Sequence, residues 1–409
     1  MDAETRTRRY IDLLLTALDL QPGNKLAIRS EPAHRDFVLS VAERAYRAGA
    51  AYVHVMAGDP RIHKARVDYA EPDSLSYVPD FLRDEYMTFT DGSWCLLSLV
   101  GPEFPDLLER VDAGRNAIIG KAQAEALKPF REALQSDRFA WCVAAVPTQG
   151  WAGKVFGRDA GPEGVERLWD VLVPILRLDQ DNPGDAWKEH ASRLQERARL
   201  LTQRHVRELH FQSTGTDLRV ELLESSVWVG GGARKPSGRL FLPNVPTEEV
   251  FTTPRKTGTR GKAVVTRPVM VLGRIVTGAW FEFVDGRVEA FGAEAGSDTL
   301  ERYFEIDPNA RYLGEIALVD SGSPVFQSNT VFYNILYDEN AACHLALGSS
   351  YPTCVEGGTG MSNEEYAEVG ANQSTLHTDF MIGSSDLNVD ATTFDGGSFP
   401  VMREGRFVI

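Results

Sequence analysis

Residues 20–56, which alternate between strand and helix patterns, read LQPGNKLAIRSEPAHRDFVLSVAERAYRAGAAYVHVM. A polar turn leads into a short strand at Leu26–Ile28, and apolar side chains then recur with helical spacing over residues 35–48. Gly49 is a typical residue just after a helix end, and Ala51–Met56 returns to a strand pattern. Two strands joined by one helix predict a βαβ unit, in which the strands run parallel.

The pattern continues on both sides of this unit. Residues 4–19 have the apolar stripe of a helix, and further strands are predicted at Cys95–Val100 and Phe139–Val146. A helix near Lys121–Gln135 separates those two strands. Strands that alternate with helices are typical of a layered sheet covered by helices. We therefore expect a doubly wound α/β domain over residues 1–185.

The second half of the chain has a different pattern. Residues 179–185 read DQDNPGD, which is polar turn chemistry and the best candidate for a domain boundary. A charged helix is predicted at 186–203, followed by short strands such as Asp217–Leu223 and Ala263–Thr266. We expect residues 186–409 to form a β-rich α+β domain, and the metal-site candidates described below fall within it.

Composition limits the classes of partner. A chain of 409 residues favours two domains, and its net charge of −15 repels polyphosphate and anionic lipid. We therefore expect no nucleic-acid partner and no membrane partner. The four cysteines have no C-x-x-C spacing, and no run approaches the 18 or so apolar residues of a membrane span. These features predict reduced thiols in a cytoplasmic protein.

Ionisable residues inside apolar runs are the main functional signal. His377 and Asp379 are two residues apart in a strand pattern, so their side chains point to the same face and can bind one ion. His344, Glu315 and Glu249 lie in similarly apolar surroundings. Such groups are costly to bury unless they are paired or coordinated. Five of them predict a metal site with more than one ion.

The other histidines carry a weaker signal. Two of the eight histidines follow residue 210, and both are in the region with the acidic candidates. The remaining six have no obvious acidic companion in the sequence, and we interpret them as structural or exposed. These are His34, His54, His63, His190, His205 and His210. The sequence also lacks G-x-S-x-G, H-E-x-x-H and G-x-x-x-x-G-K-[ST], which excludes several common catalytic devices.

Stretches spread along nearly the whole chain match one known family. They are LQPGN (20–24), AYRAGA (45–50), WCVAAVPTQGWAGKVF (141–156), LPNVPTEEVFTTP (242–254), DSGSPV (320–325), NILYDENA (334–341) and HTDFMIG (377–383). On these motifs the chain resembles the metallo-aminopeptidases of the aminopeptidase T and aminopeptidase S family, also called M29. The resemblance implies a hydrolase that releases N-terminal residues from short peptides with a free N-terminus.

The resemblance also implies two divalent metal ions that activate a water molecule. Carboxylate and imidazole ligands suit Zn, Co, Mn or Mg, so ligand type leaves the metal open. Five ligands for two ions require a shared carboxylate. The family's ligands carry over onto the same five residues that the apolar runs indicate, namely Glu249, Glu315, His344, His377 and Asp379.

A tyrosine and a second glutamate complete the expected site. The active-site tyrosine of the family falls on Tyr351, where it would stabilise the developing oxyanion. Glu248 is adjacent to Glu249, and we assign the ligand to Glu249 because it fits the family's Glu-Val-Phe pattern. The sequence leaves the general base open, with Glu248 as one candidate.

Family members are dimers whose metal site faces an enclosed cavity, so the resemblance implies a homodimer. Two alternatives remain at this point. His344, His377 and Asp379 also form a 2-His-1-carboxylate set, as in mononuclear iron(II) ring-cleaving dioxygenases. The other alternative is a catalytically inactive peptide-binding homologue.

Overall fold

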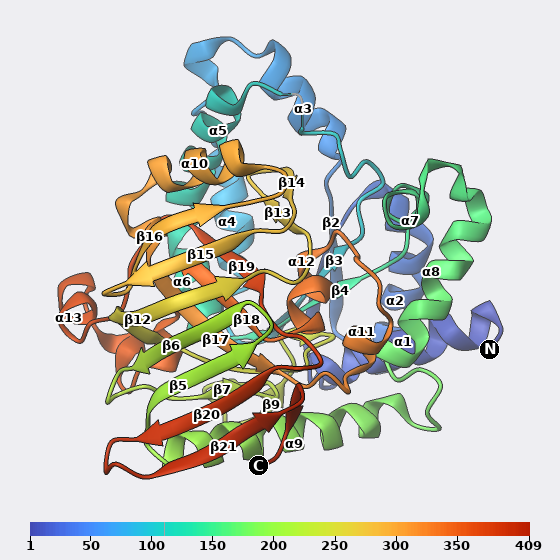
Figure 1. Ribbon diagram of the computed structural model, residues 1–409. Coiled ribbons are helices and arrows are strands. Elements are labelled where there is room, and N and C mark those ends of the chain that lie inside the picture. The colour runs from blue at the N-terminus through green and yellow to red at the C-terminus, as the bar shows by residue number, and fades with distance from the viewer. Residues whose placement is uncertain (110) are drawn as a thin grey trace. The chain divides into compact units, whose positions relative to one another are not determined.

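The structure is a computed structural model that describes residues 1–109 and 111–409 (Figure 1). It divides into two compact units. The first comprises residues 1–188 and 232–246, and the second comprises residues 189–231 and 247–409. The division of the chain into domains at residue 185 stays a prediction.

A parallel sheet organises the first unit. Its strand order is β10–β4–β3–β1–β2, and every neighbouring pair in it runs parallel. The strands are β1 (Lys25–Ser30), β2 (Tyr52–Ala57), β3 (Trp94–Val100), β4 (Ala140–Ala145) and β10 (Asn244–Val245). Helix α2 (Arg35–Arg47) connects β1 to β2, so the predicted βαβ unit is confirmed.

Several helices accompany this sheet. They are α1 (Ala3–Ala17), α3 (Pro60–Tyr69), α4 (Asp80–Thr88), α5 (Ala113–Ala126), α6 (Lys128–Gln135), α7 (Gln149–Phe156) and α8 (Gly161–Ile175). The single helix predicted over residues 121–135 is wrong, because α5 ends and α6 begins within that range. Pro129 explains the break, since proline lacks the N–H of an internal helix residue and is accepted in the first turn of a new one.

Two antiparallel sheets organise the second unit. The larger sheet has the order β16–β15–β12–β6–β5–β20–β21–β22. Its strands are β5 (Val206–Ser213), β6 (Thr216–Leu222), β12 (Pro254–Val264), β15 (Trp280–Val284), β16 (Arg287–Gly292), β20 (Asn388–Thr393), β21 (Ser398–Arg403) and β22 (Arg406–Phe407). The strand predicted at Asp217–Leu223 corresponds to β6, whereas the one predicted at Ala263–Thr266 overlaps only the last two residues of β12.

The smaller sheet has the order β19–β18–β17–β11–β7. Its strands are β7 (Val229–Gly230), β11 (Glu249–Thr252), β17 (Leu313–Val319), β18 (His344–Gly348) and β19 (His377–Met381). A short hairpin, β13 (Val269–Val271) and β14 (Arg274–Val276), and the one-turn helix α12 (Ile335–Asp338) also belong to this unit. Helix α9 (Pro183–Gln203) contains the charged helix predicted at 186–203.

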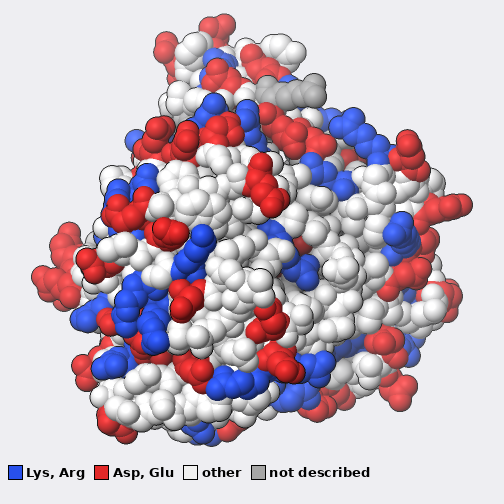
Figure 2. Space-filling model, in the orientation of Figure 1, with Lys and Arg blue, Asp and Glu red and all other residues white. Residues whose placement is uncertain are grey.

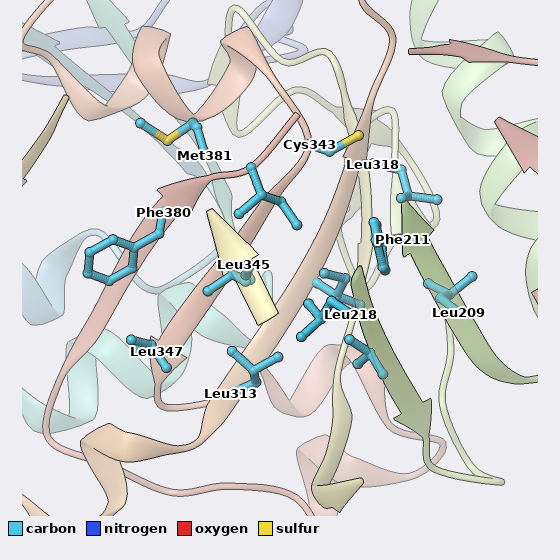
Figure 3. Close-up of a cluster of buried hydrophobic side chains, with 14 of the residues drawn as sticks. Leu209, Phe211, Leu218, Leu313, Leu318, Cys343, Leu345, Leu347, Phe380 and Met381 are labelled. Atoms are coloured by element: carbon cyan, nitrogen blue, oxygen red, sulfur yellow. The ribbon is translucent and has the colours of Figure 1, made fainter. Parts of the chain in front are cut away.

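The core of the second unit lies against one face of the smaller sheet. Leu318 and Leu345 from β17 and β18 are fully buried in one apolar cluster with Leu209, Phe211 and Leu218 of the larger sheet (Figure 3). Since side chains alternate along a strand, one face of the smaller sheet forms this core while the other face is free for different chemistry.

The fold is thus mixed α/β, with a parallel sheet and large antiparallel sheets. Figure 2 shows acidic and basic side chains interspersed over the visible face. No helix in residues 1–109 or 111–409 combines the length and apolar character needed to cross a bilayer.

Candidate metal centre

The predicted metal ligands come from four strands that are neighbours in the smaller sheet. They are Glu249 on β11, Glu315 on β17, His344 on β18, and His377 with Asp379 on β19. We refer to these five residues as the ligand cluster. Residues separated by more than 120 positions in the sequence are brought together by strand pairing alone.

Strand register places the ligand cluster on one face. Ala346 is opposite Glu315 on one side and opposite Asp379 on the other, so these three residues form a row across the sheet. His344 is two residues before Ala346, and His377 is two residues before Asp379. A spacing of two keeps each imidazole on the same face as the row. The small Ala346 side chain leaves room between the two carboxylates.

The cluster consists of two overlapping triads. Glu249, Glu315 and His344 form one triad, and Glu315, His377 and Asp379 form the other. His344 Nε2 is 3.2 Å from Glu249 Oε2 and 3.9 Å from Glu315 Oε1. His377 Nε2 is 3.4 Å from both Glu315 Oε2 and Asp379 Oδ1. The two oxygens of Glu315 therefore face two different imidazoles.

Backbone carbonyls orient both imidazole rings. His344 Nδ1 is 3.1 Å from the carbonyl oxygen of Ala342, and His377 Nδ1 is 2.7 Å from that of Ser349. A carbonyl oxygen only accepts hydrogen bonds, so each Nδ1 carries a hydrogen and donates it. This arrangement directs each Nε2 toward the carboxylates, as metal-binding histidines require.

The charge of the cluster fits a cation. Glu249, Glu315 and Asp379 are all buried, and no Lys or Arg in the described part of the chain forms an ion pair with them. Glu249 Oε2 is buried and lies 3.2 Å from His344 Nε2. Three buried carboxylates facing two imidazoles are costly unless further positive charge is added. Divalent cations supply that charge.

The titration behaviour of the imidazoles reflects the same excess of negative charge. Burial alone would lower the pKa of His344, but the hydrogen bond and charge of Glu249, with the charges of Asp379 and Glu315, raise it to about 10. Asp379 and Glu315 likewise raise the pKa of His377 well above its usual value against the effect of burial. Without a cation, the site therefore retains protons on both rings.

The pKa values of two carboxyl groups in the cluster, Glu315 and Asp379, shift in opposite directions. Burial raises the pKa of Glu315, with a smaller contribution from the charges of Glu249 and Asp379. Burial would also raise the pKa of Asp379, but the hydrogen bond and charge of His377 lower it below the usual value. Metal ions would displace the protons that these groups share.

A glycine permits the close approach of β19. Gly348 is opposite His377 in the strand register and has a positive φ of 120°. A Cβ atom at Gly348 would lie 2.1 Å from the carbonyl oxygen of Leu376, which is closer than any real contact. The backbone that carries His377 can reach its position because this residue lacks a side chain.

Tyr351 lies beside the cluster. Its hydroxyl oxygen is 3.4 Å from His377 Nε2, and the two ring centroids are 4.9 Å apart. Phe251 packs edge-on against the tyrosine ring, and Thr253 donates a hydrogen bond to the Tyr351 carbonyl oxygen. Burial and the nearby carboxylates, Glu315 first among them, raise the pKa of Tyr351 well above its usual value. Tyr351 is thus a neutral hydroxyl donor next to the imidazole.

Glu339 is a further acidic residue at the site, which the sequence reasoning missed. It follows α12 in a short 3-10 turn, and its neighbour Asn340 accepts a hydrogen bond from the backbone N–H of Glu248 at 2.7 Å. Burial raises the pKa of Glu339 well above its usual value, and the charges of Glu249, Asp379 and Glu315 raise it further. A carboxyl group that interacts electrostatically with these ligands belongs to the same site.

Comparison with known proteins identifies the family. The family described as thermophilic metalloprotease (M29) matches residues 3–407. The chain belongs to the M29 family. Aminopeptidase 2 of Geobacillus stearothermophilus is 40% identical to it over 405 residues, which cover 99% of this chain and 98% of that protein. Aminopeptidase T of Thermus aquaticus is 36% identical over 412 residues, which cover 100% of both.

A solved structure supports the same assignment. Wild-type AmpT from Thermus thermophilus matches this M29 chain with a TM-score of 0.91 and 34% sequence identity, covering 99% of both chains. The resemblance stated from the sequence motifs is therefore confirmed over the full length. The chain is a metal-dependent aminopeptidase, and hence a hydrolase.

In this M29 chain Glu248 and Glu249 have different surroundings. Glu249 lies in the ligand cluster, whereas Glu248 Oε2 is 3.3 Å from Nε2 of His190 on α9. His190 also contacts the carbonyl oxygen of Thr247 at 2.9 Å. The buried pair of Glu248 and His190 therefore lies next to the first ligand strand and helps to fix the position where it begins.

Three of the six histidines interpreted as structural or exposed have acidic partners that were not obvious in the sequence. Besides His190, His54 is 2.8 Å from Glu85, and His210 is 2.6 Å from Asp217. These partners are distant in sequence or across a hairpin, so only folding brings them together. None of these pairs shares the geometry of the ligand cluster, in which one carboxylate serves two imidazoles.

Proposed function

We propose that the chain binds two divalent ions, one in each triad, with Glu315 shared between them. The observation that carries this proposal is that the two oxygens of Glu315 face different imidazoles, at 3.9 Å from His344 Nε2 and 3.4 Å from His377 Nε2. Zn, Co, Mn or Mg suit these ligands. When bound, such ions lower the pKa of a water molecule and polarise the scissile carbonyl.

The remaining steps, substrate binding and stabilisation of the oxyanion, are assigned to residues of the chain. The proposed substrate is a short peptide with a free N-terminus, in keeping with the aminopeptidase family. Tyr351 donates its hydroxyl hydrogen toward the carbonyl oxygen of the substrate, because it lies beside His377 and keeps its proton. One such donor contributes about 3 kcal/mol to the stabilisation of an oxyanion.

Glu339 is the proposed sixth ionisable member of the site. Burial and the neighbouring carboxylates raise its pKa well above the usual value, which favours the protonated carboxyl group. Glu248 is less suited to act as general base, since His190 already faces its carboxylate. Replacing Glu339 by Gln tests this role. Lost turnover with full metal content assigns Glu339 to proton transfer, whereas lost metal assigns it to the ligands, and unchanged turnover removes it from the site.

The mononuclear iron alternative has less support. It requires His344, His377 and Asp379 around one ion, but among the described residues the two histidines belong to different triads. The presence of Glu249 and Glu315 on the neighbouring strands β11 and β17 further favours two ions.

Other expectations extend this proposal. We propose a doubly wound domain over residues 1–185 and a catalytic metal-binding domain over residues 186–409. A cytoplasmic location is supported by four cysteines that are free and buried, which suits a reducing compartment. A homodimer is proposed on the basis of the family resemblance.

The decisive experiment restores metals singly to protein stripped with EDTA. Release of a chromogenic amine from unblocked aminoacyl anilides is measured with Zn, Co, Mn, Mg or Fe(II), and N-acetylated anilides serve as the control. We expect cleavage of the unblocked substrates only, with two ions bound per chain by elemental analysis. One bound ion at full activity would contradict the two-ion proposal. No cleavage with any metal would favour the inactive homologue.

A further inference from the structure

A cavity of about 350 Å³ adjoins one side of the ligand cluster. His377 and Asp379 line it, whereas Glu249 and His344 do not. The cavity is therefore next to only one of the two triads. A substrate whose scissile carbonyl lies at the shared Glu315 would extend into this cavity in one direction only.

The size of the cavity suits a single residue. Pockets for small ligands range from about 300 to 1,000 Å³, so this cavity is near the lower limit. An aminopeptidase has one residue on the N-terminal side of the scissile bond, while the remaining peptide needs an open path on the other side. A small volume is thus appropriate for the N-terminal residue.

The walls of the cavity are largely apolar. Val269, Met270 and Ile275 come from the hairpin β13–β14, Ile335 comes from α12, and Met381 comes from β19. Methionine side chains adapt to apolar groups of different shape. The chemistry of these walls favours aliphatic and aromatic side chains.

Two of the apolar wall residues are exposed to solvent. Met270 is 40% exposed and Ile335 is 53% exposed, although both are large and apolar. They belong to different segments that meet around one cavity. Exposed apolar groups gathered at a cavity beside reactive residues are typical of a ligand-binding surface.

The loop that precedes α12 is held in a strained conformation. Tyr333, which lines the cavity, has a positive φ of 50°, which is unusual for a bulky residue. The buried carboxylate of Asp338 accepts hydrogen bonds from the backbone N–H groups of Phe332 and Asn334, at 2.8 and 3.0 Å. These bonds on both sides of Tyr333 maintain the conformation. This wall of the cavity is therefore preorganised.

We propose that this cavity binds the side chain of the substrate's N-terminal residue and selects apolar residues. The inference rests on the proposed function and specifies its substrate class. Acidic N-terminal residues are disfavoured, because the described residues that line the cavity include no Lys or Arg to pair with a carboxylate, and the apolar walls would remove water from it. Glycine is disfavoured because it leaves the apolar walls without a contact.

The test compares two cavity variants with a matched control. Met270→Asp and Ile335→Asp each place a carboxylate on a different wall, at positions exposed enough for the protein to fold. The control is Leu272→Asp, which is in the turn of the same hairpin, is 48% exposed and does not line the cavity. Its φ of 50° is also readily adopted by aspartate.

The readout is kcat/KM for two substrate series with the metal-loaded enzyme. One series varies the N-terminal residue among Leu, Phe, Gly, Glu and Lys in aminoacyl anilides. The other keeps N-terminal Leu and varies the second residue in dipeptide amides. We expect the wild type to prefer Leu and Phe over Gly by about 10- to 100-fold, with Glu cleaved most slowly.

In both cavity variants we expect the preference for Leu over Lys to fall by about tenfold or more, with an unchanged preference for the second residue. Leu272→Asp should match the wild type. Calorimetry with leucinol and lysinol, which have no scissile amide, measures the same change as binding affinity without turnover.

A changed preference for the second residue alone would assign the cavity to the other side of the scissile bond and overturn the inference. The inference would also be overturned if both cavity variants had the same Leu-over-Lys ratio of kcat/KM as Leu272→Asp. If the wild type cleaves no substrate with any metal, the proposed function fails together with the inference. If it cleaves but the ratios stay fixed, only the inference fails.

Discussion

Strands β3 and β17 resemble each other in sequence but differ in function. β3 reads WCLLSLV in the parallel sheet, and β17 reads LGEIALV in the smaller antiparallel sheet. Both are almost entirely buried on both faces. The polar residue of β3 is Ser98, a small neutral group, whereas that of β17 is Glu315, which belongs to both triads.

This difference shows what a buried carboxylate reveals. A serine in a buried strand needs one hydrogen-bond partner, which the backbone can supply. A glutamate in the same position needs positive charge, which a sheet does not contain. A strand buried on both faces that retains a carboxylate therefore indicates a ligand, while its apolar neighbours indicate only the core.

The largest expected effect comes from removing the shared charge. Glu315→Gln keeps the size of the side chain but weakens both triads, so kcat/KM should fall by about a thousandfold or more and both ions should be lost. Elemental analysis and anilide hydrolysis measure the two effects. Glu282→Gln, an exposed substitution on β15, should change neither. Retention of both ions in Glu315→Gln would show that Glu315 is not shared.

Substitutions on the core-facing side of the smaller sheet should lower stability without affecting metal binding. Leu318→Ala removes a fully buried side chain from the core and should lower the free energy of unfolding by about 2–5 kcal/mol. Leu97→Ala in β3 should have a similar cost. Urea unfolding measures the loss, and elemental analysis should find normal metal content in both variants. Metal loss in folded Leu318→Ala would mean that the two faces are not separable.

Tyr351→Phe tests a residue beside the cluster rather than within it. Losing one oxyanion donor should lower kcat by about 100- to 1,000-fold. Metal content should stay normal, because Tyr351 belongs to neither triad. Steady-state kinetics with elemental analysis separates these effects. Turnover at the wild-type level would remove Tyr351 from the mechanism.

The smallest effect is expected in the unit that contains the parallel sheet, where the partly buried carboxyl group of Asp137 forms no ion pair with any described residue. Burial raises the pKa of Asp137 to about 6, against the weaker effect of a hydrogen bond from Trp141. A carboxyl whose pKa rises on folding contributes stability below its unfolded pKa of about 4 and loses it as the pH rises through 6.

Asp137→Asn should therefore stabilise the protein above pH 6 by about 1–2 kcal/mol, after allowing for partial exposure, and have little effect near pH 4. Asparagine also accepts the positive φ of 52° at this position. Thermal unfolding at pH 4 and pH 7.5 measures the difference. An equal gain at both pH values would show that ionisation is not the cause.

Local patterns in the sequence were sufficient for much of this fold. The βαβ unit around residues 20–56 was predictable because each element has its own periodicity and Gly49 marks a helix end. Long-range pairing was not predictable. The two residues of β10 pair with β4 about 100 positions earlier, and nothing in their local sequence indicates that partner.

The candidate site also has a part that local sequence predicts and a part that depends on long-range contacts. The five candidate ligands could be selected from the sequence because each interrupts an apolar run, and their grouping into triads depended on strand register. Glu339 could not be selected, because it lies in the polar stretch Asp338-Glu339-Asn340, where a charge is unremarkable. Only the turn after α12 brings this carboxyl close to the ligands.

Gly348 extends the site beyond the residues that perform chemistry. In a complete scan of substitutions, this position should be as intolerant as the candidate ligands, since even alanine would push β19 away from β18. A search restricted to ionisable side chains would overlook it. The activity should therefore require glycine at position 348 as strictly as it requires the carboxylates of the site.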